Sequence, residues 1–502
     1  METFDYLLLG FSTALTGANL VYCLIGVTLG EIIGVLPGLG PVAGTALLLP
    51  LTYSLEPVSA IIMLSGIYYG SMYGGTITSV LINTPGESAS LITCFDGYPL
   101  AKQGRAGAAL GIASIGSFIG GIFSILGLAL IGPTLANQAL KFGPPEFFAL
   151  VFLGLSLLIG LMGKSLVKGL IGALFGLALS FVGLDISSGV ARFAFGNTNL
   201  VSGFNFVTLA MGMFGMSELL QNAENKLVSN AENPPKVKGL FPRRDEWIPC
   251  LKACGRGSVL GFFLGLIPGT TASISTILSY SLEKKLAKDP SRFGKGALEG
   301  VAGPETANNA FCGGALVPLL TLGIPTSPVI TILLGAFIMH GVTPGPSLFQ
   351  NDPKLVWGII ASMFIGNAML LIMNLPMANL WAKITLVPFR LLFPIIFVIM
   401  VVGTYSLNNN MFDVGAMIVF GLIGYFLKKT DFPLAPIILT FVLGELMEKT
   451  LIQSLVMFEG NLLLFFKRPI SATILVIAIV IITWSVITSL KNKRLNLEDS
   501  EI

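Results

Sequence analysis

The sequence predicts an all-α polytopic membrane protein with two inverted-topology repeats, each containing a re-entrant Pro-Gly hairpin and a broken transmembrane helix. Three observations lead to this prediction: an apolar composition, a glycine motif that occurs twice, and an uneven distribution of basic residues. The chain of 502 residues is 54% hydrophobic and only 11% charged. A chain of this length has room for about a dozen membrane segments of roughly 20 residues each.

The same composition excludes several classes of function. The net charge of +3 is small for the length of the chain and comes from loops, so we expect no nucleic-acid partner. His340 is the only histidine, and the five cysteines show neither a disulfide framework nor zinc-ligand spacing. We therefore predict no cofactor. The acidic N-terminus, METFDY, gives no sign of a removable signal peptide.

A glycine motif occurs twice at one constant offset. Its first copy is GVTLGEIIGVLPG, with Gly26, Gly30, Gly34 and Pro37-Gly38. The second copy is GSVLGFFLGLIPG, with Gly257, Gly261, Gly265 and Pro268-Gly269. A repeated motif of this kind in an apolar chain indicates that a membrane unit was duplicated and that its interruption was kept in both copies. A Pro-Gly pair taken alone would be better explained by a simple helix kink, but the duplicated register and the charges that flank the two copies reverse this preference.

Basic residues flank the two copies differently. Residues 1–101 contain no Lys or Arg, whereas basic residues cluster at 226–256 and 284–295, on both sides of the second copy. By the positive-inside rule, the flanks of the second copy are cytoplasmic and those of the first are not. Arms of about a dozen residues would span roughly 18 Å of a core of roughly 30 Å. We therefore predict re-entrant hairpins at about 20–53 and 255–283, which enter from opposite faces.

A second pair of interruptions follows the hairpins. The segment INTPGESAS breaks the apolar run of about 57–101, and LGIPTSP breaks that of about 298–341. Gly-Gly pairs precede both breaks, and Gly74 is aligned with Gly313. Proline frees backbone polar atoms, and these are tolerated at membrane depth only inside protein or beside a watered cavity. The breaks therefore predict a polar site within the membrane.

These features divide the chain into four parts. We predict a first inverted repeat at 1–220, a cytoplasmic linker at 221–253, a second inverted repeat at 254–490 and a cytoplasmic tail at 491–502, with a periplasmic N-terminus. The remaining apolar runs are 106–134, 144–163, 166–182, 199–220, 355–380, 386–405, 411–427, 434–466 and 470–490. Glu445, Glu448 and Lys449 interrupt the run 434–466, so the crossings between 430 and 470 remain open.

The predicted chemistry is an anion site beside a cation site. Helix N-termini present unpaired N–H groups to an anion, whereas hydroxyls and free carbonyls bind a small cation. The predicted substrate-binding residues are Gly38, Leu39, Gly40, Asn83, Thr84, Gly86, Ser88, Gly269, Thr270, Thr271, Pro325, Thr326 and Ser327. The predicted neighbours of a sodium ion are Thr84, Glu87, Ser273, Asn308 and Asn309. Glu31 either couples an ion or faces an aqueous cleft.

Four segments closely resemble the large membrane subunit of the bacterial tripartite tricarboxylate transporters. They are GVLPGLGPVAGTALLLPLT, INTPGESAS, GLIPGTTASISTILSYSLEKK and GPETANNAFCGGALVPLLTLGIPTSP, and the likeness extends over essentially the whole chain. The resemblance implies a secondary carrier in the bacterial inner membrane that imports citrate-like or related organic carboxylates on a sodium or proton gradient. It also implies two partners, a small membrane subunit and a periplasmic solute-binding protein.

Two further comparisons bear on mechanism and on other functions. Hairpins combined with broken helices are similar to those of elevator-type carriers of dicarboxylates, which implies that one core moves against a scaffold. A stand-alone ion-coupled carrier would share these features. An intramembrane enzyme would need a catalytic motif, and the sequence has no HExxH, no Gly-x-Ser-x-Gly and no paired Asp in an apolar setting, so we expect no enzyme. The acid carried, the coupling stoichiometry, the oligomer and the moving elements are not determined by the sequence.

Overall fold

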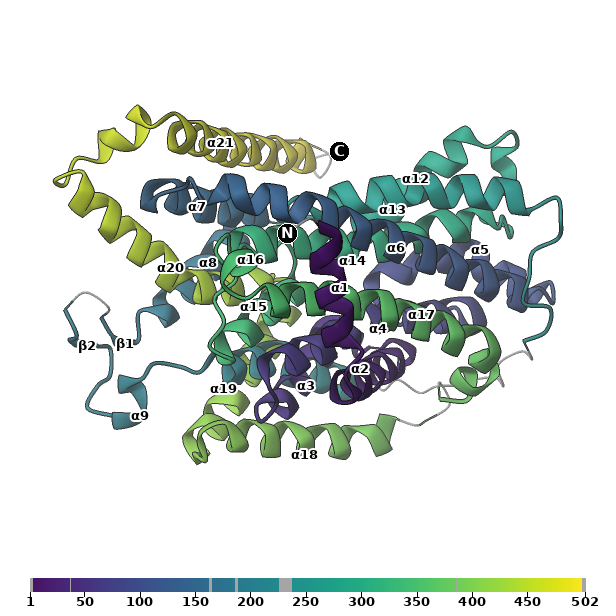
Figure 1. Cartoon of the computed structure of the whole chain (residues 1–502), viewed down its shortest axis with the longest axis horizontal. Helices are drawn as coiled ribbons and strands as arrows, with labels where there is room; N and C mark the ends of the chain where they lie inside the picture. The colour runs from purple at the N-terminus through teal and green to yellow at the C-terminus, as the bar shows by residue number, and fades with distance from the viewer. Residues whose placement is uncertain are drawn as a thin grey trace.

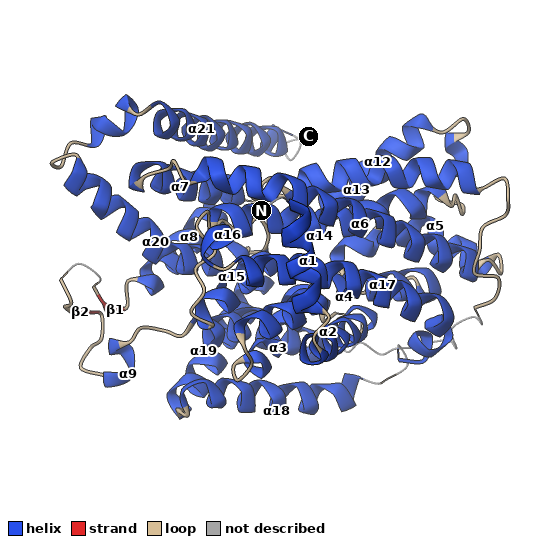
Figure 2. Cartoon of the chain, viewed as in Figure 1, coloured by secondary structure: helices blue, strands red, loops and turns tan. Residues whose placement is uncertain are grey.

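The described part of the chain is almost entirely helical (Figure 2). The computed structural model of the chain describes residues 3–36, 38–161, 165–185, 188–224, 237–384, 387 and 389–498. Within these ranges a single short antiparallel pair joins β1 (Gly183–Leu184) to β2 (Ala191–Arg192). Six described helices are long and apolar enough to cross a membrane. The all-α membrane class is therefore confirmed.

The first half of the chain begins with the elements that form the predicted hairpin and broken helix. These are α1 (Thr3–Ala14), α2 (Gly17–Val35), α3 (Gly40–Leu48), η1 (Leu49–Thr52), α4 (Pro57–Ile82), η2 (Ser88–Leu91) and α5 (Thr93–Lys102). The chain continues through α6 (Ala106–Ala139), α7 (Pro144–Leu161), α8 (Leu166–Ser180), α9 (Thr198–Val201), α10 (Phe206–Ala210), the π-helix η3 (Met211–Met216) and α11 (Ser217–Glu224). The helix predicted from residue 199 starts only at Phe206, because Gly203, at φ +74°, separates α9 from α10.

The second half starts with the equivalent elements and ends with four long helices. They are α12 (Trp247–Gly265), α13 (Ala272–Leu286), η4 (Pro290–Arg292), α14 (Glu299–Leu322), α15 (Pro328–Met339), α16 (Leu348–Asn351), α17 (Pro353–Ile384), α18 (Phe389–Asn408), α19 (Met411–Lys429), α20 (Ala435–Met457), η5 (Leu462–Lys467) and α21 (Pro469–Glu498). Residues 225–236 of the predicted linker and 499–502 of the predicted tail lie outside the described residues.

Helix α20 occupies most of the interrupted run 434–466. It runs unbroken through Glu445, Glu448 and Lys449. The Glu448 carboxylate accepts two hydrogen bonds from the Arg192 guanidinium, at 2.7 and 3.0 Å. A bidentate pair of this kind offsets much of the cost of placing a charged side chain on an otherwise apolar helix.

The hairpin arms are longer than the sequence suggested. Helices α2 and α12 each contain 19 residues, against the dozen expected, and α2 is long enough to cross a membrane by length and composition. The expectation that no arm can span alone is therefore wrong for α2, because this helix begins well before the glycine motif. The second arms are shorter, with nine residues in α3 and 15 in α13.

The glycine motifs bring α2 against α4 and α12 against α14. A Cβ added to any glycine of the two triplets would lie 2.2–2.5 Å from a carbonyl oxygen of the neighbouring helix. These carbonyls belong to Met63, Ile67 and Ser71 for Gly26, Gly30 and Gly34, and to Gly303, Ala307 and Phe311 for Gly257, Gly261 and Gly265. Only glycine allows backbones to approach so closely, so the two helix pairs pack in the same way.

This packing corrects the predicted alignment of Gly74 with Gly313. An added Cβ at Gly74 would lie 2.3 Å from the Glu31 carbonyl oxygen, and one at Gly314 would lie 2.3 Å from that of Phe262. Glu31 and Phe262 occupy the same position in the two glycine motifs, so Gly74 corresponds to Gly314. The other glycine of each pair follows this position in the first half (Gly75) and precedes it in the second (Gly313). Aligning the pairs as units therefore gave a register that is wrong by one residue.

Helices α4 and α14 form the centre of the molecule. Residues 59–81 of α4 and 300–321 of α14 are all buried. Helices buried on every side lie in the core of a large protein rather than at its surface. Figure 1 shows both helices inside the body, whereas α21 and α18 lie along its upper and lower edges in that view. The second break, residues 323–327, is therefore held in the interior, whereas the first break is buried at Gly86 and Glu87 and exposed at Asn83 and Ser88.

Candidate functional site

The two hairpin tips have the same backbone conformation. Gly38 has a φ of +88° and Gly269 a φ of +86°. The residue after each glycine donates its N–H three residues back, from Leu39 to Leu36 at 3.4 Å and from Thr270 to Ile267 at 3.3 Å. Such positive φ values favour glycine over every other residue, which explains the Gly of each Pro-Gly pair. Pro37, predicted at the first tip, lies outside the described residues.

Each tip is held by a polar contact with another element. At the first tip, Asn222 of α11 donates from Nδ2 to the Gly38 carbonyl at 2.8 Å. At the second tip, the Gly269 N–H donates to the Thr326 carbonyl at 3.0 Å. The second tip therefore contacts the second break directly, and the predicted substrate residues Gly269 and Thr326 are neighbours.

Two hydroxyls of the second hairpin form hydrogen bonds with the backbone where α12 ends and α13 begins. Thr270 donates from Oγ1 to the carbonyls of Leu264 and Ile267, at 2.5 and 2.7 Å. The Thr271 hydroxyl accepts from the Ile274 N–H at 3.3 Å and is the N-cap of α13. N-capping satisfies one of the unpaired N–H groups of a helix start and leaves the others directed beyond the helix end. The N-terminus of α13 is thus a suitable position for a carboxylate.

The two breaks share a second matched geometry. Asn83, at φ +55°, ends α4, and Gly323, at φ +71°, ends α14. The following residues donate N–H groups to equivalent carbonyls, Thr84 to Thr78 and Ile324 to Pro318, both at 3.3 Å. The chain is then extended and reaches almost the same angles at Glu87 (φ −144°, ψ 164°) and Ser327 (φ −145°, ψ 165°). A short helix begins after each, with Pro85 and Pro325 inside the extended segments.

The first break is bonded to elements of the second half. Glu87 accepts from Asn308 Nδ2 of α14 at 3.0 Å through one carboxylate oxygen, and from the Ala89 N–H at 2.9 Å through the other. The hydroxyls of Ser88 and Ser273 lie 3.0 Å apart, which joins the first break to the second hairpin. Four predicted site residues therefore meet in pairs across the two halves.

Glu305 forms another polar contact between the halves. This fully buried residue of α14 accepts hydrogen bonds from Thr76 of α4 at 2.6 Å and from Thr93 of α5. Asn309, one turn later, donates from Nδ2 to the Glu305 carbonyl at 3.2 Å, and its buried Oδ1 has no hydrogen-bond partner. Asn308 Oδ1 and Ser327 Oγ are also buried without a partner. These three oxygens are free to bind a ligand or an ion.

The other predicted residues lie at the first tip and at the breaks. The Thr84 hydroxyl donates to the Ile82 carbonyl at 3.3 Å within the first break. Gly40 begins α3 at φ +59°, and Leu39 and Pro325 are buried. Gly86 is enclosed, because a Cβ there would lie 2.0 Å from the Gly34 carbonyl oxygen.

Residues 20–439 match the model of the Tripartite tricarboxylate transporter TctA family. The chain belongs to this family. The resemblance found in the sequence motifs is therefore confirmed, and the function class is transport. The match includes both tips and both breaks, whereas residues 440–502 of this TctA-family chain lie outside it.

Two similar proteins come from Agrobacterium vitis. The "Uncharacterized 52.8 kDa protein in TAR-I ttuC' 3'region" is 46% identical over 495 residues, which cover 98% of each chain. The "Uncharacterized protein in TAR-II ttuC' 3'region" is 47% identical over 234 residues, which cover 47% of this TctA-family chain and 97% of the relative. No solved structure matches the chain.

Two buried acids of this TctA-family chain lie outside the predicted substrate and sodium residues: Asp96, which the sequence did not single out, and Glu31, for which it left ion coupling and an aqueous cleft open. Asp96 of α5 accepts the backbone N–H groups of Gly294, Gly296 and Ala297 at 2.7–2.9 Å and the Tyr280 hydroxyl at 2.9 Å. It thereby holds the loop after the second hairpin against the first half. Glu31 is fully buried beside Asn374. The signal that marked Glu87, an acid inside an apolar segment, could also have marked Asp96.

Proposed function

We propose that the chain is the large transport subunit of a binding-protein-dependent secondary transporter that imports an organic carboxylate, citrate or a related acid, on a sodium or proton gradient. The observation that carries this proposal is the convergence of the second tip, both breaks and α14, where the Gly269–Thr326 and Glu87–Asn308 bonds are buried and the Ser88–Ser273 bond is exposed. The bonds that join them are Gly269 to Thr326, Ser88 to Ser273 and Glu87 to Asn308.

The polar groups at this convergence suit a carboxylate that must be bound and released. The start of α13 offers N–H groups, and the neighbouring side chains offer hydroxyls and amides. None of the residues that make the three joining bonds is basic. A fixed Arg would bind a carboxylate through a strong bidentate pair and slow its release. Binding through helix ends and hydroxyls is weaker, which suits a carrier.

The matched tips and breaks support two inverted-topology repeats, at 1–220 and 254–490. Equal φ values at Gly38 and Gly269 and equal cap bonds at the two breaks are expected when one unit was duplicated. The charge distribution supports opposite entry, with a periplasmic N-terminus and a cytoplasmic C-terminus in the bacterial inner membrane.

The second hairpin supports re-entrance most clearly. Arg256, in the middle of α12, donates to both carboxylate oxygens of Glu283, near the end of α13. The outer end of α13 therefore lies beside the middle of α12, and both belong to the region rich in basic residues. An elevator-like motion of hairpins and breaks against the outer helices would carry such a site across the membrane.

The coupling ion would bind beside the carboxylate. The predicted sodium neighbours supply oxygen donors, and Asn308 Oδ1 and Asn309 Oδ1 are buried without partners. Oxygen ligands of this kind suit a small hard cation. The family name implies two partners, the small membrane subunit and a periplasmic solute-binding protein that delivers the acid.

Reconstituted uptake tests this function. We expect vesicles containing this chain, the small membrane subunit and the binding protein to accumulate one acid of a labelled panel that includes citrate and succinate, under an imposed sodium or proton gradient. Omitting the binding protein should leave micromolar uptake nearly silent, because the membrane site alone releases the acid readily. Full-rate uptake without the binding protein would instead identify a stand-alone carrier, and no uptake of any acid would contradict the proposed function.

A further inference from the structure

Glu31 differs from the other buried acids of the interior in its hydrogen bonds. It lies on α2, one turn before this helix ends at Val35, and is fully buried, so it does not face an aqueous cleft. Its Oε2 accepts from Asn374 Nδ2 of α17 at 3.1 Å, whereas its Oε1 is buried and has no partner. Glu87 and Glu305, by contrast, each have both carboxylate oxygens bonded.

The elements around Glu31 provide little to balance a negative charge. Helix α2 packs against α1, α3, α4 and α17. Their titratable side chains are Asp5 and Tyr6 on α1, Tyr68, Tyr69 and Tyr73 on α4, and Lys354 and Lys383 near the ends of α17, with none on α3. Lys383 is nine residues beyond Asn374, or about 13 Å along the helix axis. Among the described residues no ion pair includes Glu31.

We propose that Glu31 is a proton-binding site that couples proton movement to transport. A bare carboxylate buried with one hydrogen bond and no cation is costly, whereas a carboxylic acid fits this position. The carboxylate takes up one proton when the first hairpin packs against α17, and it releases that proton when the arm moves. This inference rests on the proposed carrier function and names its coupling ion.

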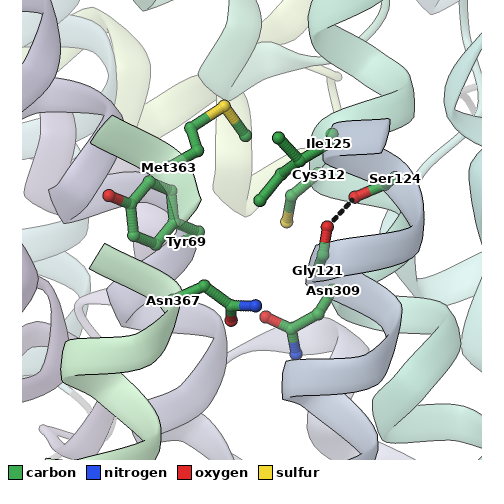
Figure 3. A pocket seen from close by; sticks show the side chains of 9 residues that line it. Tyr69, Gly121, Ser124, Ile125, Asn309, Cys312, Met363 and Asn367 are labelled. Atoms are coloured by element: carbon green, nitrogen blue, oxygen red, sulfur yellow. Dashed lines mark hydrogen bonds between the residues drawn. The ribbon is translucent and has the colours of Figure 1, made fainter. Parts of the chain in front are cut away.

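A line of polar groups leads from Glu31 toward α14. Tyr73 is close enough to Glu31 to interact with it electrostatically, and its hydroxyl donates to Asn367 Oδ1 at 2.5 Å. Asn367 and Asn309 line one small pocket between α4, α6, α14 and α17, and Figure 3 shows their amides directed toward one another. A pocket with room for about one water molecule would give a proton a polar route to α14.

The two hairpins differ at this position. The residue of the second motif that corresponds to Glu31 is Phe262, which is buried against apolar and aromatic neighbours. Only the first hairpin therefore carries an acid at this position of the glycine motif. The site predicts one proton bound per hairpin pair rather than two.

Infrared spectroscopy of the purified chain in bilayers tests proton binding without reference to transport. We expect the wild type at neutral pH to show a protonated-carboxyl C=O band that is lost in Glu31→Gln. The matched control is Glu56→Gln, since Glu56 is exposed and makes no side-chain capping bond. If the band is the same in wild type and Glu31→Gln, Glu31 does not hold the proton and the proposal is overturned.

Transport assays with the reconstituted complex test the coupling. Glu31→Gln should abolish net citrate accumulation driven by a pH gradient, because the amide cannot release a proton. It should keep citrate exchange between equal pools at the wild-type rate, now independent of pH. Glu31→Asp should retain part of the net accumulation, which separates loss of the acid from loss of folding. Wild-type accumulation by Glu31→Gln overturns the proposal. A wild-type infrared band that is lost in Glu31→Gln, together with no exchange of any acid by the wild type, would contradict only the carrier function.

Discussion

Replacing Gly86 with alanine is expected to cause one of the largest losses of uptake of any single methyl addition. The new Cβ would lie 2.0 Å from the Gly34 carbonyl oxygen, 2.7 Å from Gly75 Cα and 3.0 Å from Thr78 Oγ1. These atoms belong to the end of the first hairpin arm and to two turns of α4, so the first break would have to move away from both. Overpacking of this kind costs about 1–3 kcal/mol, equivalent to a roughly 5- to 150-fold change in an equilibrium.

Uptake normalised to surface expression, together with thermal unfolding, measures this effect. Gly255→Ala is the matched control, because Gly255 lies in α12 with no atom within 4 Å of an added Cβ. It should leave uptake unchanged and raise stability slightly, since alanine favours helix. Equal uptake by the two variants would mean that the first break can shift without consequence and that the tight packing at Gly86 has no role in the site.

Replacing Glu87 with alanine should have a comparably large effect on both stability and uptake. The change removes the acceptor of two buried donors, the Ala89 N–H and Asn308 Nδ2. Each buried donor left without a partner costs about 1–3 kcal/mol. Asn308 would then have no side-chain partner for its amide nitrogen, and its Oδ1 is already unpaired. The bond between the first break and α14 would be lost.

A double-mutant cycle that combines Glu87→Ala with Asn308→Ala separates the energy of the hydrogen bond between these residues from the other effects of each single substitution. We expect a coupling energy of about 0.5–3 kcal/mol, as found for contacting residues. Glu56→Ala is the control, because Glu56 is also an N-cap glutamate but is exposed and makes no side-chain capping bond. If Glu87→Ala changed stability and uptake no more than Glu56→Ala does, or if the cycle showed strict additivity, the contact between the first break and α14 would not contribute to stability.

The fold was largely predictable because its strongest signals are local. Apolar runs located nearly every long helix, and the repeated glycines predicted the closest backbone contacts. Helix ends were harder to predict: α2 and α12 extend beyond the expected arms because the glycine motifs mark where each helix packs and not where it begins. The equivalence of Gly74 with Gly314 depends on contacts between helices, which a one-dimensional alignment of Gly-Gly pairs does not contain.

The sequence predicted which residues belong to the site, but it did not predict which of them form hydrogen bonds with one another. The breaks and tips were recognised from Pro, Gly and hydroxyl residues, yet the bonds from Glu87 to Asn308 and from Ser88 to Ser273 join segments far apart in the chain. Tertiary packing determines such pairs. The same holds for Asp96, because the backbone N–H groups that donate to its carboxylate lie in a loop some 200 residues later. An acidic residue in an apolar segment can be recognised in the sequence, but only the packed structure shows which groups donate hydrogen bonds to it.

The central claim is that the second tip and the first break surround the carboxylate, and thiol protection at position 273 tests it most directly. The five native cysteines are buried, so Ser273→Cys adds a reactive thiol at the Ser88 contact over a low background. The acid that wild-type vesicles accumulate should slow modification of this thiol several-fold, and should leave Ser12→Cys, on the exposed face of α1, unaffected. An unchanged rate at position 273 under saturating acid, in a variant that still transports, would contradict this placement of the site.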